Sequence, residues 1–257
     1  MREAVIVEAI RSPIGKRNGR LAGLHPVDLL ATVLQALLER AGIDPALVDD
    51  HVAGCVAQVG EQGMNVARNA WLAAGLPESV PATTVDRQCG SSQQAVHFAA
   101  QGVMAGAYDL VIASGVEHMT RVPMGSNVRL GPGSPLTSAG LCARYGERLV
   151  PQGLSAEMVA ERWALPREEL DAFAFRSHRR AAAAIREGRF AAETAPIRSR
   201  RAIGGSQRRR CSSDPSSAIA PIASPEWTPM KVLRLASPRA SSMPASPAAT
   251  GLIPGQP

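Results

Sequence analysis

The amino-acid sequence predicts an α/β protein built on a mostly parallel β-sheet with helices on both faces. Short apolar, β-prone runs alternate with helical segments through residues 4–120, the pattern of strand-helix units around a parallel sheet. The chain has 257 residues, of which 45% are hydrophobic and only 4% aromatic. It can therefore bury a substantial core, and that core must be largely aliphatic.

The individual elements follow from hydrophobic periodicity and from residues that begin or end helices. Pro26 opens an amphipathic helix and Gly42 closes it, while Gly75 ends the next one. We expect strands at residues 5–9, 51–59, 83–88 and 109–114, and helices at residues 26–41, 65–74 and 92–105. The last helix is apolar on nearly every side, which is typical of a helix at the centre of a fold. No later segment of the sequence offers a continuous apolar face, so we expect the far side of this helix to be uncovered.

Beyond residue 120 the pattern changes twice. Residues 121–153 are rich in Gly, Pro and Ser and predict an irregular excursion over the active-site face, followed by helices at 155–163 and 166–187. The second helix carries a stripe of arginines that we interpret as a solvated face: Arg176, Arg179, Arg180 and Arg186. We expect residues 1–120 to form the core domain and residues 121–197 a partial helical domain.

Residues 198–257 differ in composition from everything before them. They are rich in Arg, Ser, Pro and Ala and have almost no amphipathic period, which predicts a disordered tail that adds little stability. One interpretation is a GC-rich coding region read in the wrong frame near codon 197. An authentic divergent tail is the alternative.

Charge and cysteine usage exclude several classes of protein. The formal net charge is +6, but nine basic and two acidic residues lie from Arg198 onward, so residues 1–197 are close to neutral and no nucleic-acid surface is expected. The four cysteines are scattered, which argues against a disulfide framework or a metal site. No apolar run approaches the length of about 20 residues that spans a bilayer. A cytoplasmic, soluble protein without a membrane partner is expected.

Cys89 lies where a predicted strand ends and a helix begins at once. Residues 83–85 are β-prone, Gly90 permits a sharp turn, and Ser91 or Ser92 can cap the helix. A thiol in the first turn of a helix is stabilised as the thiolate by the helix dipole, and its pKa can fall from about 8.5 to between about 3.5 and 7.5. A buried core cysteine is the alternative interpretation, but the strand-Cys-Gly-Ser-helix order favours a nucleophile.

Four segments in this order resemble the thiolase family, which includes acetyl-CoA acetyltransferases and 3-ketoacyl-CoA thiolases. They are residues 5–15 (VIVEAIRSPIG), Cys89-Gly90-Ser91-Ser92, residues 113–120 (ASGVEHMT), and residues 168–174 with Arg189-Phe190. The resemblance covers residues 4–197 and implies the N-terminal half of a thiolase, whose two similar halves pack into five layers. Two departures are Asp86, where the family usually has a small polar residue, and Gln93, where it often has an aliphatic one.

The resemblance implies that Cys89 accepts an acyl group as a thioester, with acyl-CoA and CoA as substrates and no tightly bound cofactor or metal. It also implies a homo-oligomer in the intact family. The family further uses a histidine in a Gly-His-Pro motif, a basic cysteine in a Cys-x-Gly motif and an Asn-Glu-Ala-Phe segment, none of which occurs here. His25 precedes Pro26 but opens a helix, and His118 is expected near the site. The chain by itself is therefore expected to be inactive.

Three functions remain as alternatives. The first is an acyltransferase of fatty acid β-oxidation or steroid breakdown, since Gln88 and Gln93-Gln94 resemble bacterial degradative thiolases more than biosynthetic ones. The second is a non-catalytic fragment or pairing module that joins a full-length thiolase through its third strand. The third is a decarboxylating ketoacyl synthase, which shares the fold and the cysteine, although the local motif favours a thiolase.

Overall fold

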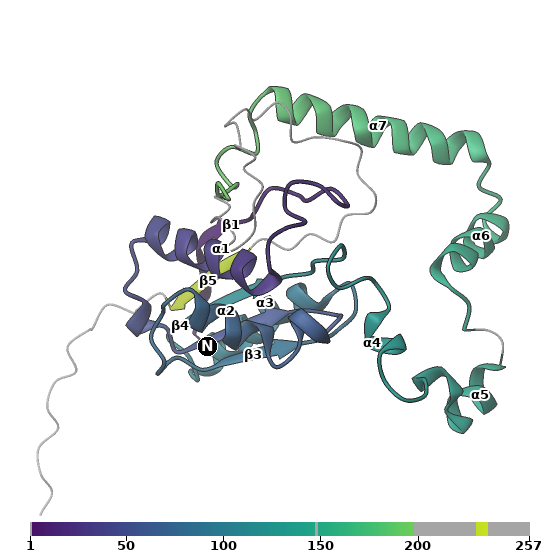
Figure 1. The fold of residues 1–257 in the computed structure, drawn as a ribbon. Coiled ribbons are helices and arrows are strands. Elements are labelled where there is room, and N and C mark those ends of the chain that lie inside the picture. Colours follow the sequence, from purple (N-terminus) through teal and green to yellow (C-terminus); the bar gives the residue numbers. More distant parts are fainter. Residues whose placement is uncertain (1, 147–148, 198–229, 236–257) are drawn as a thin grey trace, which may run out of the picture.

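The computed structural model describes residues 2–146, 149–197 and 230–235, and within them it contains a five-stranded sheet with the order β1-β5-β4-β2-β3 (Figure 1). The strands are β1 (Ala4–Ile10), β2 (Asp50–Gly54), β3 (Ala82–Val85), β4 (Leu110–Gly115) and β5 (Met230–Leu235). β2 runs parallel to both β3 and β4, while β5 is antiparallel to β1 and β4. The predicted α/β class is confirmed.

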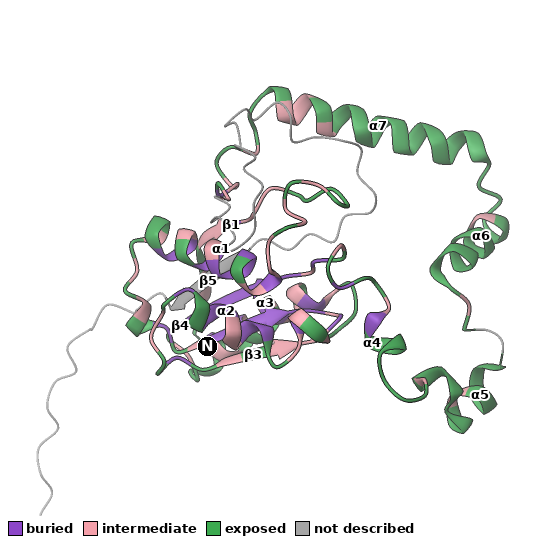
Figure 2. Cartoon of the chain, in the orientation of Figure 1, coloured by how far each residue is buried: buried purple, intermediate pink, exposed green. Residues whose placement is uncertain are grey.

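Three helices cover the two faces of the sheet, as predicted. They are α1 (Pro26–Ala41), α2 (Val66–Ala73) and α3 (Ser91–Ala105). Along β2 and β4, alternate residues point to opposite faces. Ala53 and Ile112 belong to the core beneath α1 and α2, whereas Val52 and Val111 belong to the core beneath α3. Figure 2 shows the buried residues concentrated in these layers.

The first helix illustrates how local sequence signals fix an element. Pro26 occupies its first turn, the His25 ring nitrogen Nδ1 accepts a hydrogen bond from the Val27 amide at 3.3 Å, and Gly42 ends it with φ of 63°. A left-handed backbone angle of this kind favours glycine. Leu34 and Leu37 are fully buried on the side that faces the sheet. The interpretation of His25 as a helix-opening residue is confirmed.

The two strands that precede α3 in the sequence, β2 and β3, end earlier than predicted, and every predicted strand begins within a residue of its observed start. β2 ends at Gly54 rather than at residue 59, because residues 55–62 turn back at the sheet edge and include a short 3-10 helix, η2 (Gly60–Gln62). β3 ends at Val85 rather than at 88. Another 3-10 helix, η1 (Pro45–Leu47), links α1 to β2.

α3 is not buried on every side. Ala95, Ala99 and Val103 face the sheet and are fully buried, but Phe98 remains 45% exposed and Met104 40% exposed. The far side of the helix is therefore uncovered, as expected for a chain whose later segments offer no apolar face. Its inner face is buried as expected, and its outer face has no covering layer among the described residues.

β5 corrects the prediction that residues 198–257 lack regular structure. Residues 230–235 lie in the middle of the sheet and pair with both β1 and β4, with Ala4 opposite Leu235 and Leu110 opposite Arg234. The other residues of the predicted tail lie outside the described part of the chain. Because β1 reaches the rest of the sheet through β5, the prediction that the tail adds little stability no longer follows.

Residues 121–197 lead away from the sheet and return to it (Figure 1). This segment contains α4 (Ser126–Arg129), a 3-10 helix η3 (Pro135–Thr137), α5 (Ala139–Tyr145), α6 (Gln152–Arg162) and α7 (Arg167–Arg186). The two long predicted helices are confirmed, and the excursion at 121–153, predicted to be irregular, contains short helices. At its start Arg121 bonds Glu61 and the Asn127 side-chain nitrogen bonds the Val56 carbonyl, both in the segment that follows β2. No residue of α5, α6 or α7 is buried.

The segment rejoins the sheet at the end of β1. The Arg11 amide donates to the Glu193 carbonyl and the Ala195 amide donates to the Arg11 carbonyl, each at 2.8 Å. The Arg11 guanidinium also bonds the Glu193 carboxylate and stacks over the Phe190 ring at 5.1 Å.

None of the helices in the described part of the chain has the length and the apolar composition that a membrane span requires.

Candidate active site

The carboxyl ends of three parallel strands meet at one edge of the sheet. Gly54 at the end of β2 is paired with Val85 of β3 on one side and with Gly115 of β4 on the other. In sheets of this kind ligands bind just beyond the carboxyl ends of the strands. The segments that carry Cys89 and His118 both leave the sheet at this edge.

Cys89 is exposed on a tight turn between β3 and α3. The residue before it, Gln88, has a left-handed backbone with φ of 49°, a conformation that is uncommon outside glycine and that often marks functional turns. The Asp86 carboxylate oxygen Oδ1 accepts a hydrogen bond from the Gln88 amide at 2.7 Å. The turn therefore presents the Cys89 side chain outward.

Two details of this turn differ from the sequence prediction. Gly90 is the N-cap of α3 and Ser91 is its first residue, so Cys89 lies one residue before the cap and not in the first turn of the helix. Ser91 does not cap the helix: its hydroxyl accepts from the Arg87 amide at 2.9 Å and donates to the Gln88 carbonyl at 2.5 Å. The hydroxyl bonds the preceding turn and not the helix, because the Arg87 amide and the Gln88 carbonyl need hydrogen-bond partners.

Glycines at two strand ends let α3 approach the sheet edge closely. A Cβ atom added to Gly54 would lie 2.2 Å from the Ser92 amide nitrogen, and one added to Gly115 would lie 1.8 Å from the Ser92 hydroxyl oxygen. Both separations are far below any normal contact, so no other residue type fits without movement. These two glycines set the position of the helix that follows Cys89.

His118 lies at the same sheet edge but is held by a different neighbour. Its side chain is buried, and its ring nitrogen Nε2 donates to the Leu21 carbonyl at 3.0 Å. Its amide donates to the Gln62 side-chain oxygen at 2.7 Å. These contacts anchor residue 118 to the loop after β1, and the expected role of His118 beside the nucleophile stays a prediction.

A half-buried carboxylate organises the loop that follows β2. The Glu117 carboxylate accepts from the Val56 amide at 2.8 Å and from the Gln62 side-chain nitrogen at 2.9 Å. Close by, the exposed Arg121 guanidinium forms a two-point ion pair with Glu61, with nitrogen–oxygen distances of 2.5 and 2.6 Å, and lowers the pKa of that carboxyl. Neither pairing could be predicted from the sequence, because the partners are more than 50 positions apart.

The cysteines differ sharply in their surroundings. Cys55 at the end of β2 is fully buried, and its pKa is raised to about 12, first by burial and then by the Glu117 and Asp86 carboxylates. Such a thiol is unreactive at neutral pH. Cys142 in α5 is exposed, as Cys89 is, whereas Cys211 lies outside the described residues. Exposure alone therefore separates Cys89 from Cys55 but not from Cys142.

One buried titratable residue, His51, was not predicted from the sequence. His51 of β2 is fully buried against Trp71, and its ring nitrogen Nε2 lies 2.7 Å from the Ser114 hydroxyl. Burial lowers its pKa to about 3, so the ring is neutral at physiological pH. Its side chain points to the α1 and α2 face of the sheet, away from the core beneath α3.

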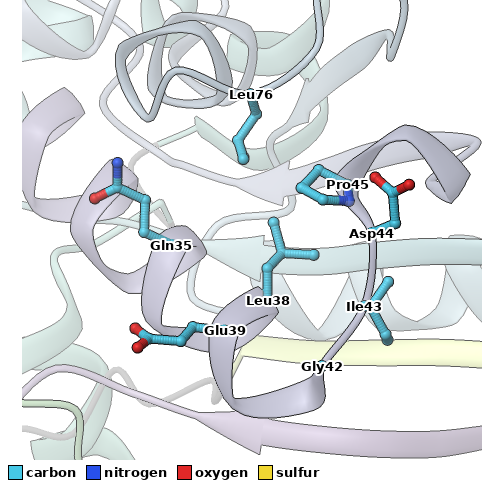
Figure 3. Close-up of a pocket in the computed structure, with 8 residues that line it drawn as sticks. All are labelled: Gln35, Leu38, Glu39, Gly42, Ile43, Asp44, Pro45 and Leu76. Atoms are coloured by element: carbon cyan, nitrogen blue, oxygen red, sulfur yellow. The ribbon is translucent and has the colours of Figure 1, made fainter.

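A shallow hollow lies at the opposite edge of the sheet (Figure 3). It is lined by the end of α1, the segment that leads into η1, and one residue of the loop that follows α2. The lining residues are Gln35, Leu38, Glu39, Gly42, Ile43, Asp44, Pro45 and Leu76. These segments lead into the amino ends of β2 and β3, so the hollow is not part of the Cys89 edge.

Among residues 2–146, 149–197 and 230–235 there is no cluster of His, Cys, Asp or Glu that could hold a metal ion.

Comparison with known proteins decides the family. The profile of the family described as "Thiolase, N-terminal domain" matches residues 4–214. The chain belongs to the thiolase family. This confirms the resemblance found in the Cys89 motif and its flanking segments, and the match runs beyond residue 197, where the sequence analysis placed its end.

Individual thiolases agree with this assignment. The chain is 49% identical over 195 residues to the steroid 3-ketoacyl-CoA thiolase FadA6 of Mycobacterium tuberculosis, covering 74% of this chain and 48% of that protein. It is 43% identical over 198 residues to a 3-ketoacyl-CoA thiolase of Bacillus subtilis, covering 77% and 49%. The chain spans about half the length of these curated thiolases.

A solved structure shows the same relationship in three dimensions. The crystal structure of the acetyl-CoA acetyltransferase of Bacillus anthracis superposes with a TM-score of 0.63 at 35% identity, covering 79% of this chain and 53% of that one. The fold is therefore that of a thiolase N-terminal half.

Proposed function

We propose that this chain supplies the acyl-accepting half of a thiolase, with Cys89 as the residue that takes the acyl group from a CoA thioester. The observation that carries the proposal is the exposed Cys89 on a left-handed turn directly before α3, at the carboxyl edge of a parallel sheet. The N-terminus of α3 favours negative charge on a nearby sulfur. Membership in the thiolase family supports the same role.

The proposed step is an exchange of thioesters. The Cys89 thiolate attacks the carbonyl carbon of the substrate, forming a new carbon–sulfur bond, and the tetrahedral intermediate collapses with loss of the CoA thiolate when the donor is acetyl-CoA. One thioester replaces another, so no oxidant, reductant or metal takes part. When the donor is a 3-ketoacyl-CoA, the attack is on its 3-keto carbon, the bond between carbons 2 and 3 breaks, and acetyl-CoA leaves after protonation.

We propose 3-ketoacyl-CoA or acetyl-CoA as the donor, within fatty acid or steroid breakdown. The names of the relatives support this range, since one is called a steroid 3-ketoacyl-CoA thiolase and others are called 3-ketoacyl-CoA thiolases. The glutamines around the nucleophile, Gln88 and Gln93, were the sequence feature that favoured a degradative role. A cytoplasmic location stays part of this proposal.

The sequence contains the nucleophile but not the other catalytic motifs that the family resemblance implies, namely Gly-His-Pro and Cys-x-Gly. A complete cycle needs a base for the α-carbon and an activator of the thiol. We therefore propose that the chain alone performs the first half-reaction without turnover.

A CoA-release assay tests this half-reaction. With acetyl-CoA in excess, the expected result is release of about one CoA per chain and then a plateau. Continuous thiolysis of a 3-ketoacyl-CoA that depends on Cys89 would contradict the absence of turnover. No CoA release at all would contradict the half-reaction.

A second candidate function is pairing with a full-length thiolase through β3. This strand lies at the end of the sheet order, so one of its edges has no neighbouring strand in the described part of the chain. Unpaired strand edges are sites for strand addition. Gel filtration of the chain mixed with a full-length relative tests this function: co-elution supports it, and separate elution contradicts it.

A further inference from the structure

We propose that Asp86 is a positioning residue for Cys89, which it holds in place by stabilising the left-handed backbone of Gln88. The inference rests on the proposed nucleophilic role of Cys89. It gives a function to a residue at which this sequence departs from the usual family pattern.

Gln88 has an unfavourable backbone conformation. Its φ of 49° lies in the left-handed region, where a side chain with a Cβ atom is crowded against the following carbonyl. Gln88 immediately precedes Cys89, so the direction in which the Cys89 side chain leaves the turn depends on this angle. If Gln88 relaxed to an ordinary backbone conformation, the sulfur would be carried away from the start of α3.

The Asp86 carboxylate stabilises this conformation directly. Its oxygen Oδ1 accepts from the Gln88 amide at 2.7 Å, two residues along the chain, which is the arrangement of an Asx-turn. A hydrogen bond to a charged oxygen is stronger than one between neutral groups. Asp86 is exposed at the surface, so it adds nothing to the hydrophobic core.

The remaining hydrogen bonds of the turn fasten it to the helix and do not support the Gln88 amide. The Ser91 hydroxyl bonds the Arg87 amide and the Gln88 carbonyl, and the Gly90 amide donates to the Arg87 carbonyl at 3.1 Å. These bonds hold the two ends of the turn together. The Asp86 carboxylate bonds Gln88, the residue in the middle of the turn whose backbone is strained.

The charge of Asp86 works against a thiolate, since two negative groups close together repel. A role through charge would therefore make Cys89 less reactive, whereas a role through hydrogen-bond acceptance would make it more reactive. Asparagine separates the two, because its side-chain oxygen accepts the same bond without the charge. Glycine at position 88 tests whether Asp86 acts by relieving backbone strain. It adopts the left-handed conformation at no steric cost, so the turn no longer needs the Asp86 hydrogen bond.

The test uses iodoacetamide on the folded full-length chain, with the Cys89 labelling rate measured relative to that of Cys142 in the same sample. Cys142 is also exposed but lies in α5, so it serves as an internal reference. The buried Cys55 reports folding, because it labels only when the fold opens.

The variants are Asp86→Ala, Asp86→Asn and the double variant Asp86→Ala/Gln88→Gly. Asp44→Ala is the matched control, since Asp44 makes the same type of bond, to the Ala46 amide at 3.0 Å, beside η1.

We expect the Cys89 to Cys142 ratio to be well above one in the parent chain and to fall by about tenfold in Asp86→Ala, the factor for losing a hydrogen bond to a charged group. Asp86→Asn and Asp86→Ala/Gln88→Gly should restore it, and Asp44→Ala should leave it unchanged. An unchanged ratio in Asp86→Ala, with Cys55 still protected, would overturn the positioning role. Failure of both rescue variants to restore the ratio would also overturn it. A ratio near one in the parent chain would instead overturn the proposed nucleophile itself.

Discussion

The Ser92 hydroxyl occupies the space where a side chain on Gly115 would begin: an added Cβ atom would lie 1.8 Å from the Ser92 oxygen. Gly115→Ala should therefore push the start of α3 away from the sheet. Overpacking of this kind typically lowers the free energy of unfolding by about 1–3 kcal/mol. We expect a decrease of this size in urea unfolding, together with slower alkylation of Cys89, because the turn before α3 moves with the helix.

Gly153→Ala is the control for this prediction. Gly153 lies in α6, and no atom lies within 4 Å of a Cβ added there. Its replacement should leave unfolding and Cys89 alkylation unchanged. If Gly115→Ala were as well tolerated as Gly153→Ala, the close approach of α3 to β4 would be wrong.

The buried His51 predicts a loss of stability on mild acidification. Burial lowers the pKa of His51 from 6.5 to about 3 in the folded chain, so the unfolded chain binds the proton first as pH falls. The stability from the neutral ring is complete above pH 6.5 and declines below it. Between pH 7.5 and 5 the free energy of unfolding should fall by about 2 kcal/mol from this residue.

Urea unfolding at the two pH values measures this loss, and His51→Gln is the comparison. Glutamine cannot take up a proton in this range but can still bond Ser114, which His51 contacts at 2.7 Å. The variant should lose the His51 share of the pH dependence. Equal pH dependence in the parent and the variant would contradict the assignment of a neutral buried ring.

Removal of residues 198–257 should destabilise the chain. Those residues include β5, which joins β1 to β4 by antiparallel pairing along both of its edges. Without β5, the backbone groups of β1 lose their partners, and β1 loses its connection to the other strands. Removal of residues 236–257 alone retains β5 and is the matched control. Similar thermal unfolding of the two truncated chains would show that β5 does not stabilise the sheet.

The uncovered face of α3 should bind an apolar dye. Phe98 and Met104 are 45% and 40% exposed on this helix, and exposed large apolar side chains offer binding surface for such dyes. We expect strong ANS fluorescence that Phe98→Gln/Met104→Gln reduces without lowering the melting temperature. Replacement of the exposed Leu47 on η1 by Gln is the control. Equal fluorescence in all three proteins would place the dye elsewhere.

The sequence predicted those parts of the fold that local signals determine. Residues 26–41 were assigned as a helix because Pro26 and Gly42 mark its ends and leucines line one face, and α1 has those bounds. β5 was missed because its six residues include Lys231 and Arg234, so its apolar residues are too few to stand out within an Arg-, Ser- and Pro-rich region. Its place in the sheet depends on pairing with β1, which lies more than 200 positions away.

The candidate site shows the same division. Cys89 was found because the strand, the turn and the helix around it are adjacent in sequence. The sequence could not show that the Ser91 hydroxyl turns back to Arg87 and Gln88, since a cap and a turn bond need the same residue type. Nor could it show that His118 bonds the Leu21 carbonyl, 97 positions earlier.

Peptide mass mapping of the full chain, after incubation with acetyl-CoA and acid quenching, tests whether Cys89 accepts an acyl group. We expect an acetyl group on the peptide that contains Cys89, sensitive to hydroxylamine as thioesters are, and absent from Cys89→Ala. Cys142→Ala should acquire the same label as the parent chain. Acetylation of Cys89→Ala to the same extent as the parent, or no thioester on any peptide of the folded parent chain, would contradict the account.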